Sequence, residues 1–131
     1  MNIIKTYLIT FIVFMGVDLI WLGVVAKKLY SRELGYIMSP KPNWVAAIVF
    51  YLLFVGGIVF FVLNPALSKN SWTYALFVGM FFGLITYSTY DLTNLATLKD
   101  WPILITVIDL IWGTTLGGLT AVVSYFILDK I

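Results

Sequence analysis

Three aspartates stand within long apolar stretches of the sequence, where an ionisable side chain is expensive to bury. Asp18 and Asp109 each begin a copy of the tetrapeptide Asp-Leu-Ile-Trp, and Asp91 begins the related segment Asp-Leu-Thr-Asn. A charged aspartate in the middle of a membrane helix costs about 2.5–3.5 kcal/mol on insertion scales, and such residues almost always face a bundle interior or a wet cavity. The three carboxyl groups are therefore the first candidates for chemistry.

The three aspartates are also expected to share one depth. Each lies eight or nine positions from the nearest charged residue of a connecting segment, and these charged residues are Lys27, Lys99 and Asp100. A helix rises about 1.5 Å per residue, so each carboxyl is expected about 12–14 Å inside the same membrane face. The first and last spans run in opposite directions, so the repeated tetrapeptide is inverted at that depth, as in the inverted repeats of transporters.

Aromatic and polar residues accompany the aspartates at helical spacing. Tyr87, Asp91 and Asn94 follow the i, i+4, i+7 pattern of one helix face. The tryptophans of the two tetrapeptides each stand three positions after the aspartate and share its face. The sequence therefore predicts an acidic ligand-binding pocket with aromatic walls. Its predicted residues are Asp18, Trp21, Tyr87, Tyr90, Asp91, Thr93, Asn94, Asp109 and Trp112.

The stretches that carry these residues are long enough to cross a bilayer. The chain has 131 residues, of which 62% are hydrophobic and 11% charged, and about 20 apolar residues span the hydrocarbon core as a helix. Clusters of charge, proline and asparagine, with turns expected at Asn64-Pro65 and from Asp100 to Pro102, separate four spans. These lie near residues 3–26, 44–63, 73–98 and 102–128. The predicted fold is all-α: one integral membrane four-helix bundle over residues 1–131.

The connection between the first two spans, residues 27–43, combines charge with apolar residues. It is expected to be either a short helix in the membrane interface, ended by Pro40 and Pro42, or a plain loop. Five Lys or Arg residues flank this side of the spans and three flank the other, which predicts a cytoplasmic location for this side and both termini outside. The first span lacks a small-residue cleavage pattern and is expected to be retained.

The composition narrows the chemistry further. The sequence holds no cysteine and no histidine, which excludes thiolate or imidazole metal sites and a histidine general base. Carboxylates, hydroxyls, amides and lysines remain, and the only candidate metal ligands are Asp18, Asp91 and Asp109. The net charge of +2 is spread among the connections without a basic run, so nucleic acid is not an expected partner. No cofactor and no catalytic residue can be named.

Glycine pairs at four-residue spacing mark two of the spans. Gly79 and Gly83 form a small-xxx-small pair on the third span, and Gly113 and Gly117 form another on the fourth. Such pairs allow helix backbones to approach closely. They are expected to pack helices together, either within one chain or across a homodimer, with membrane lipid as the other partner.

Five stretches stand out as motifs: residues 17–23 with Asp-Leu-Ile-Trp, 42–44 with 50–53, 64–67, 87–102 with Tyr-Asp-Leu-Thr-Asn-Leu-Ala-Thr-Leu, and 109–113 with Asp-x-x-Trp-Gly. Together they resemble a bacterial family of small four-helix predicted membrane proteins that is classed as a domain of unknown function. The resemblance covers essentially the whole chain. It implies a multi-pass protein of the inner (plasma) membrane and makes these residues the family's signature, but it implies no activity.

Three kinds of function remain open at this point. A protein that binds or transports a cation or small solute, as a homodimer, fits the acidic pocket. A lipid- or isoprenoid-active enzyme fits a pocket that opens on one side only, because the other end of each span is expected to be nearly all apolar. A subunit that binds a lipid or cofactor without turnover fits the short loops. Whether the protein is an enzyme is left open.

Overall fold

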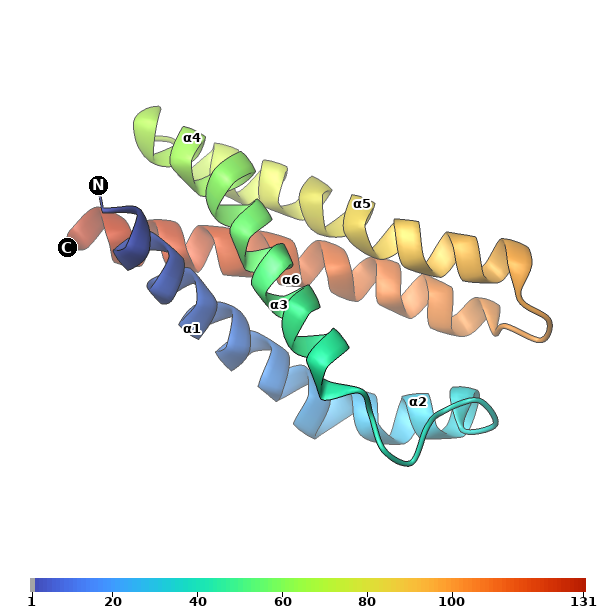
Figure 1. Cartoon of the computed structure of the whole chain (residues 1–131). Coiled ribbons are helices and arrows are strands. Elements are labelled where there is room, and N and C mark those ends of the chain that lie inside the picture. The colour runs from blue at the N-terminus through green and yellow to red at the C-terminus, as the bar shows by residue number, and fades with distance from the viewer. Residues whose placement is uncertain (1) are drawn as a thin grey trace.

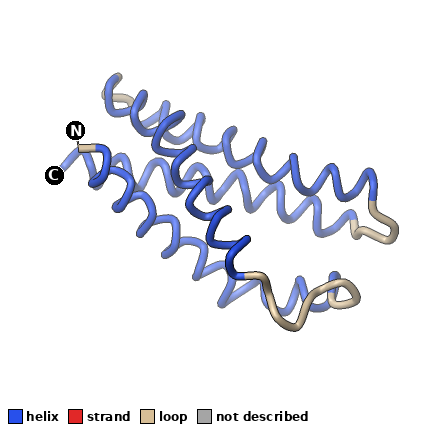
Figure 2. The backbone as a smooth tube through the Cα atoms, viewed as in Figure 1, coloured by secondary structure: helices blue, strands red, loops and turns tan. Residues whose placement is uncertain are grey.

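The computed structural model describes residues 2–131, which form helices joined by short loops (Figure 2). Helix α1 (Ile3–Trp21) continues through a π-helical segment, Leu22–Ala26, into α2 (Lys27–Leu34). Helix α3 (Trp44–Gly57) continues in the same way through a π-helical segment, Ile58–Leu63, into α4 (Asn64–Ser68). Two long helices, α5 (Trp72–Thr97) and α6 (Ile103–Lys130), complete the chain.

Four continuous helical segments are long and apolar enough to cross a membrane. They are Ile3–Leu34, Trp44–Ser68, Trp72–Thr97 and Ile103–Lys130. The described residues contain no strand. The predicted fold class, an all-α membrane bundle of four helices, is therefore confirmed.

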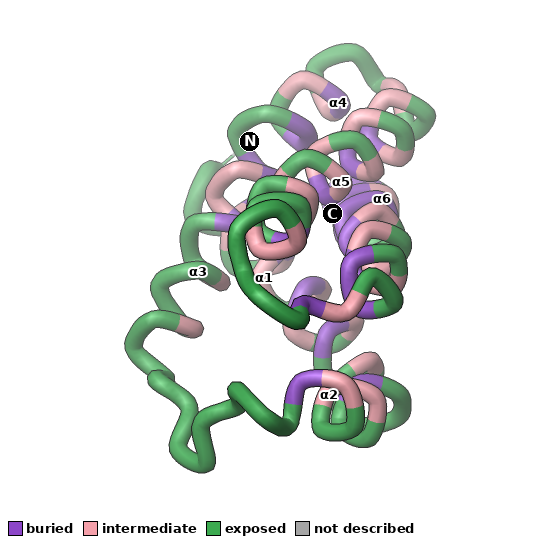
Figure 3. Tube along the Cα trace, turned by 90° about the vertical axis from the view of Figure 1, so that its right-hand side faces the viewer, coloured by how far each residue is buried: buried purple, intermediate pink, exposed green. Residues whose placement is uncertain are grey.

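The helices alternate in direction, so their connections lie at two ends of the bundle (Figure 1). Both termini and the turn from α4 to α5 lie at one end, which we call the terminal end. The end of α2, the loop that follows it and the turn from α5 to α6 lie at the other, which we call the loop end. Helices α5 and α6 run side by side along their length, and α1 also packs on α6. Buried residues are most frequent along α6, whereas the first half of α3 is almost entirely exposed (Figure 3).

The predicted turn at Asn64-Pro65 is wrong, because the second membrane helix continues to Ser68. A proline inside an α-helix lacks a donor, and its ring collides with a carbonyl one turn earlier. The π-helical segment directly before Pro65 widens the helix there, so the ring is accommodated. The chain turns instead around Asn70, which has a φ of 50°. Ser71 then caps α5 by accepting a hydrogen bond from the Tyr74 backbone N–H at 3.0 Å.

The other connections follow the sequence more closely. The turn before the last helix lies where it was predicted, and Asp100 has a φ of 61° there. Residues 27–43 combine the two expected alternatives, because the first eight form α2 and the remainder form a turn and loop. Helix α2 extends the first span instead of forming a separate interfacial helix. Its residue Leu34 packs with Trp101 and Ile105 at the beginning of α6.

Glycines bring α5 and α6 into backbone contact. A β-carbon at Gly79 would lie 2.7 Å from the Gly117 carbonyl oxygen, and one at Gly83 would lie 3.2 Å from the Gly117 Cα and closer still to the Gly113 carbonyl. Both glycine pairs thus face each other within one chain. This is the packing within one chain that was one of the two expected roles of the glycines.

Candidate functional site

The three aspartates are buried in the bundle interior, although they come from three different helices. The exposed fractions of Asp18 on α1, Asp91 on α5 and Asp109 on α6 are 6%, 0% and 5%. Asp18 ends a row of buried residues at four-residue spacing along α1, a row that also contains Thr10 and Phe14. The faces that carry the aspartates therefore point inward, as the cost of a lipid-facing carboxylate requires.

Asp91 is the most deeply buried of the three aspartates. Its carboxyl group lies beside that of Asp109, near enough for the two to interact directly. Neither oxygen of Asp91 makes a hydrogen bond of good geometry with any described residue. A fully buried polar group without a partner is uncommon in folded proteins and costs about 1–3 kcal/mol or more. Such a group indicates a position that a proton or ligand completes.

No cationic side chain neutralises these carboxyl groups within residues 2–131. The one ion pair there joins Arg32 and Glu33 at 3.4 Å on the surface of α2, away from the aspartates. No group of three or more acidic side chains in the described chain is close enough to hold a metal ion. Asp18, Asp91 and Asp109 therefore do not converge on one point as the ligands of a single metal ion would.

Tyr30 belongs to this site although the sequence pattern did not reveal it. Its hydroxyl group donates a hydrogen bond to Oδ1 of Asp109. Tyr30 can contact Asp109 because of the π-helical segment between α1 and α2. The wider π-helical turn contains one extra residue, so Ala26 and Tyr30 face the inside of the bundle. A regular helix would have placed Tyr30 at a different angle, so its position could not be read from spacing alone.

We predict that Tyr30→Phe destabilises the protein by about 1–2 kcal/mol, because it leaves a buried carboxyl oxygen without its donor. Thermal unfolding in detergent would measure the effect. Tyr36→Phe is the matched control, because the Tyr36 hydroxyl donates to the backbone carbonyl of Asp100 at an exposed position. Equal losses in the two variants would show that the Tyr30 contact to Asp109 has no special role.

Tyr87 stands at the centre of the site. Its phenol lies within electrostatic reach of all three aspartates and of Tyr51 on α3. Its ring rests on Gly113, where a β-carbon would lie 2.7 Å from the Tyr87 Cβ, so only glycine leaves room for it. The other side of the ring meets Phe50 and Phe54 edge-on, each with a centroid separation of 6.4 Å. Tyr87 thus contacts α3 on one side and lies near the carboxyl groups on the other, where Tyr51 of α3 also lies near Asp18.

The two tryptophans of the repeated tetrapeptide meet each other. The rings of Trp21 and Trp112 stack with centroids 4.5 Å apart and planes 8° from parallel. They line two shallow pockets of about 330 and 250 Å³ between α1 and α6. The tryptophans therefore join the two copies of the motif, but they do not line the same cavity as Tyr90.

The remaining predicted residues on α5 are divided between two sides of the helix. Tyr90 lies near Asp91 and Asp109, and Asn94 is half-buried beside Tyr90. Thr93 is exposed and stands apart from the carboxyl groups. Two positions along a helix correspond to a rotation of about 200°, so Thr93 cannot share a face with Asp91. The structure brings the aspartates, Tyr87, Tyr90 and Asn94 together and leaves Thr93 outside.

A second polar layer lies nearer the terminal end, where the spans were expected to be nearly all apolar. It consists of the buried hydroxyl residues Thr6, Thr10, Thr120 and Ser124. The hydroxyls of Thr120 and Ser124 make no hydrogen bond with the described residues. Between this layer and the aspartates lie Phe14 and Leu116, both with no exposed surface. The interior is therefore polar at two depths with an apolar barrier between them.

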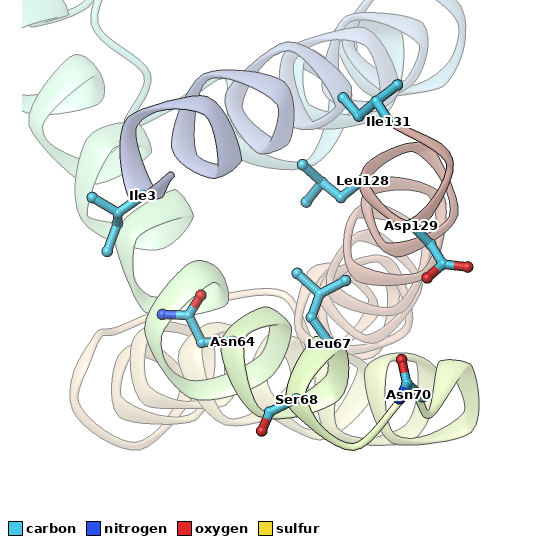
Figure 4. A pocket seen from close by; sticks show the side chains of 8 residues that line it. All are labelled: Ile3, Asn64, Leu67, Ser68, Asn70, Leu128, Asp129 and Ile131. Atoms are coloured by element: carbon cyan, nitrogen blue, oxygen red, sulfur yellow. The ribbon is translucent and has the colours of Figure 1, made fainter. Parts of the chain in front are cut away.

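Two further pockets open on the surface. One of about 310 Å³ lies between α3 and α5 and is lined by Phe50, Thr86, Tyr87 and Tyr90. Another of about 570 Å³ lies at the terminal end, where α4 and the end of α6 frame it (Figure 4). Its acidic residue is Asp129, which is exposed and distant in sequence from the buried cluster. The pocket between α3 and α5 adjoins the buried carboxyl groups through Tyr87.

Comparison with known proteins supports the membrane assignment. A family profile described as a predicted membrane protein, DUF2177, matches residues 3–126. No curated protein and no solved structure matches the chain. The match covers all four helices that are long and apolar enough to cross a membrane, which makes this a multi-pass membrane protein. The chain belongs to the DUF2177 family of predicted membrane proteins.

Proposed function

We propose that this protein binds a cation or small positively charged solute at an intramembrane site formed by Asp91 and Asp109, and exchanges it for protons across the membrane. The observation that carries the proposal is Asp91, which is fully buried beside the carboxyl group of Asp109 and receives no hydrogen bond from any other described residue. A structural aspartate would be expected to have partners for those oxygens.

Electrostatics gives the reason for exchange. Three ionised carboxyl groups in an apolar bundle without a counter-charge would be very costly, and two adjacent carboxyl groups do not readily ionise together. The empty site therefore holds at least one proton. An entering cation supplies the missing positive charge and releases that proton, so binding of the cation and loss of the proton are coupled.

The hydroxyl layer supports transport over simple binding. Thr120 and Ser124 offer unpaired oxygens on the terminal side of the apolar barrier formed by Phe14 and Leu116. A solute or proton that crosses must pass this barrier, which has no polar group of its own. Transport therefore requires a movement of α1 against α6 at Phe14.

Proteoliposomes that enclose a pH-sensitive dye test this function. Addition of Na⁺, K⁺, Mg²⁺ or tetramethylammonium to the outside is expected to drive proton release for at least one of them. Asp91→Asn should abolish the signal, whereas Asp129→Asn, the same change at an exposed position on α6, should leave it intact. The transport proposal fails if no cation moves protons, or if the two variants behave alike.

The charge distribution supports an inner-membrane location with the loop end in the cytoplasm, since five of the eight Lys and Arg residues flank that end. The chain has no native cysteine, so single cysteines can report the orientation. We predict that a membrane-impermeant maleimide labels Ser68→Cys in intact spheroplasts and Ser39→Cys only in inverted vesicles. The reverse pattern would place both termini in the cytoplasm.

A lipid- or isoprenoid-active enzyme is the second candidate, because the pocket between α3 and α5 lies beside a buried carboxyl group that could donate a proton. Such an enzyme would change the membrane lipids of its cell. Identical lipid compositions with and without the gene would exclude it.

A further inference from the structure

The pocket between α3 and α5 opens toward the surrounding lipid. Its volume of about 310 Å³ is at the lower end of the range for small-molecule sites. Two of its four lining residues, Phe50 and Tyr90, are 41% and 55% exposed on helices that cross the membrane. Helix α3 diverges from α5 at its beginning, whereas the π-helical segment after it packs against α5 (Figure 1). The opening is therefore lateral, on the side where α3 stands apart.

The same pocket adjoins the buried carboxyl groups, with Tyr87 and Tyr90 between them. Tyr87 lines this pocket, and its phenol group is within electrostatic reach of the three aspartates. Asp91 follows Tyr87 by four positions, which is about one helical turn, and Tyr90 lies near both Asp91 and Asp109. An apolar groove and an unneutralised acidic site thus meet at Tyr87.

The geometry points to a cationic amphiphile as the ligand: a molecule with an ammonium group and an apolar chain, dissolved in the bilayer, that enters between α3 and α5. This inference rests on the proposed function, since it names the class of cation. The chain would lie between Phe50 and Tyr90, and the ammonium group would approach Asp91 and Asp109 past the face of Tyr87.

The acidic side chains and the aromatic walls of the groove favour an ammonium ligand over a small metal ion. No three acidic side chains of residues 2–131 converge as metal coordination requires. An ammonium group with methyl substituents needs no fixed coordination shell, and aromatic faces attract it by about 0.5–2 kcal/mol each. Four tyrosines lie near the carboxyl groups, namely Tyr30, Tyr51, Tyr87 and Tyr90, and two of them, Tyr87 and Tyr90, line the groove. The groove also supplies apolar surface that a bare metal ion cannot use.

Equilibrium binding in lipid nanodiscs tests the inference, with radiolabelled dodecyltrimethylammonium as the ligand and tetramethylammonium and dodecanol as comparisons. Dodecyltrimethylammonium should bind saturably and at least tenfold more tightly than either comparison, and Asp91→Asn should weaken it at least tenfold. Thr86→Phe should fill the groove and weaken only the long-chain ligand. Phe50→Ala, a second groove variant, should do the same by removing a wall. Phe60→Ala is the control, since Phe60 faces lipid outside the groove.

The outcomes separate this inference from the proposed function. Suppose that tetramethylammonium or a metal ion binds and that this binding depends on Asp91. If the dodecyl chain then adds no affinity, or if neither groove variant has an effect, the ligand is not an amphiphile, but the cation site remains supported. If dodecanol binds as tightly as the ammonium compound, the groove is an uncharged lipid site and the inference is overturned. If no cation binds the wild-type protein, the proposed function fails and this inference fails with it.

Discussion

Asp91→Asn is expected to stabilise the protein while it removes cation binding, which is the opposite of what loss of a structural residue would do. The wild-type carboxyl group is fully buried beside Asp109, and no other described residue donates a hydrogen bond to it. An asparagine of nearly the same shape carries no charge and can donate its amide to Asp109. We expect a gain of about 1 kcal/mol in the free energy of unfolding, because the pair no longer has to take up a proton or bury a second charge.

Thermal unfolding in detergent, with and without added cation, would measure both effects of Asp91→Asn. The wild-type protein should melt at a higher temperature when the cation is present, because ligand binding stabilises the folded state. The variant should start from a higher melting temperature and show no further rise. A variant that loses stability would identify Asp91 as a structural partner of Asp109, and the site would then need no ligand.

Gly83→Ala is expected to be the most damaging single-methyl change in the chain. The new β-carbon would collide with the Gly113 carbonyl and lie 3.2 Å from the Gly117 Cα, and backbone atoms cannot turn aside as a side chain can. Helices α5 and α6 would have to separate, which costs about 1–3 kcal/mol or more. Because Asp91 and Asp109 lie on these two helices, cation binding should weaken as well.

Gly16→Ala is the matched control for this change. Gly16 lies in α1, and no heavy atom stands within 4 Å of the position where its β-carbon would be. Alanine is the better helix former by about 1 kcal/mol, so this variant should be as stable as the wild type or slightly more so. Thermal melts of both variants would measure the contrast, and equal effects would contradict the close packing of α5 on α6.

Much of the fold could be predicted because membrane helices follow from length and apolar composition. The four spans and the turn at Asp100 required no tertiary information. The helix ends were harder, because Pro65 is accommodated by a π-helical segment that no sequence pattern announces. The contact of Tyr30 with Asp109 could not be predicted for the same reason, because the direction of Tyr30 depends on one extra residue in the π-helical turn before it.

The aspartates themselves could be identified, but their partners depend on how the helices pack. Burial of Asp18, Asp91 and Asp109 follows from the cost of a carboxylate in lipid. The groove at Phe50 exists because α3 is inclined away from α5, an angle that helical periodicity does not determine. The spacing of Thr120 and Ser124 at i and i+4 was visible in the sequence, yet hydroxyl residues are common enough in membrane helices that spacing alone does not single them out.

The central claim is that buried carboxyl groups hold a proton in the empty site and give it up to a cation. Infrared difference spectroscopy of the purified, reconstituted protein tests this most directly, because protonated and ionised carboxyl groups absorb at different frequencies. The account predicts that the wild-type protein at neutral pH shows a band of a protonated carboxyl group, which disappears when the cation is added. This change should be absent from the difference spectrum of Asp91→Asn. Three ionised aspartates in the absence of any cation, with no change on addition, would contradict it.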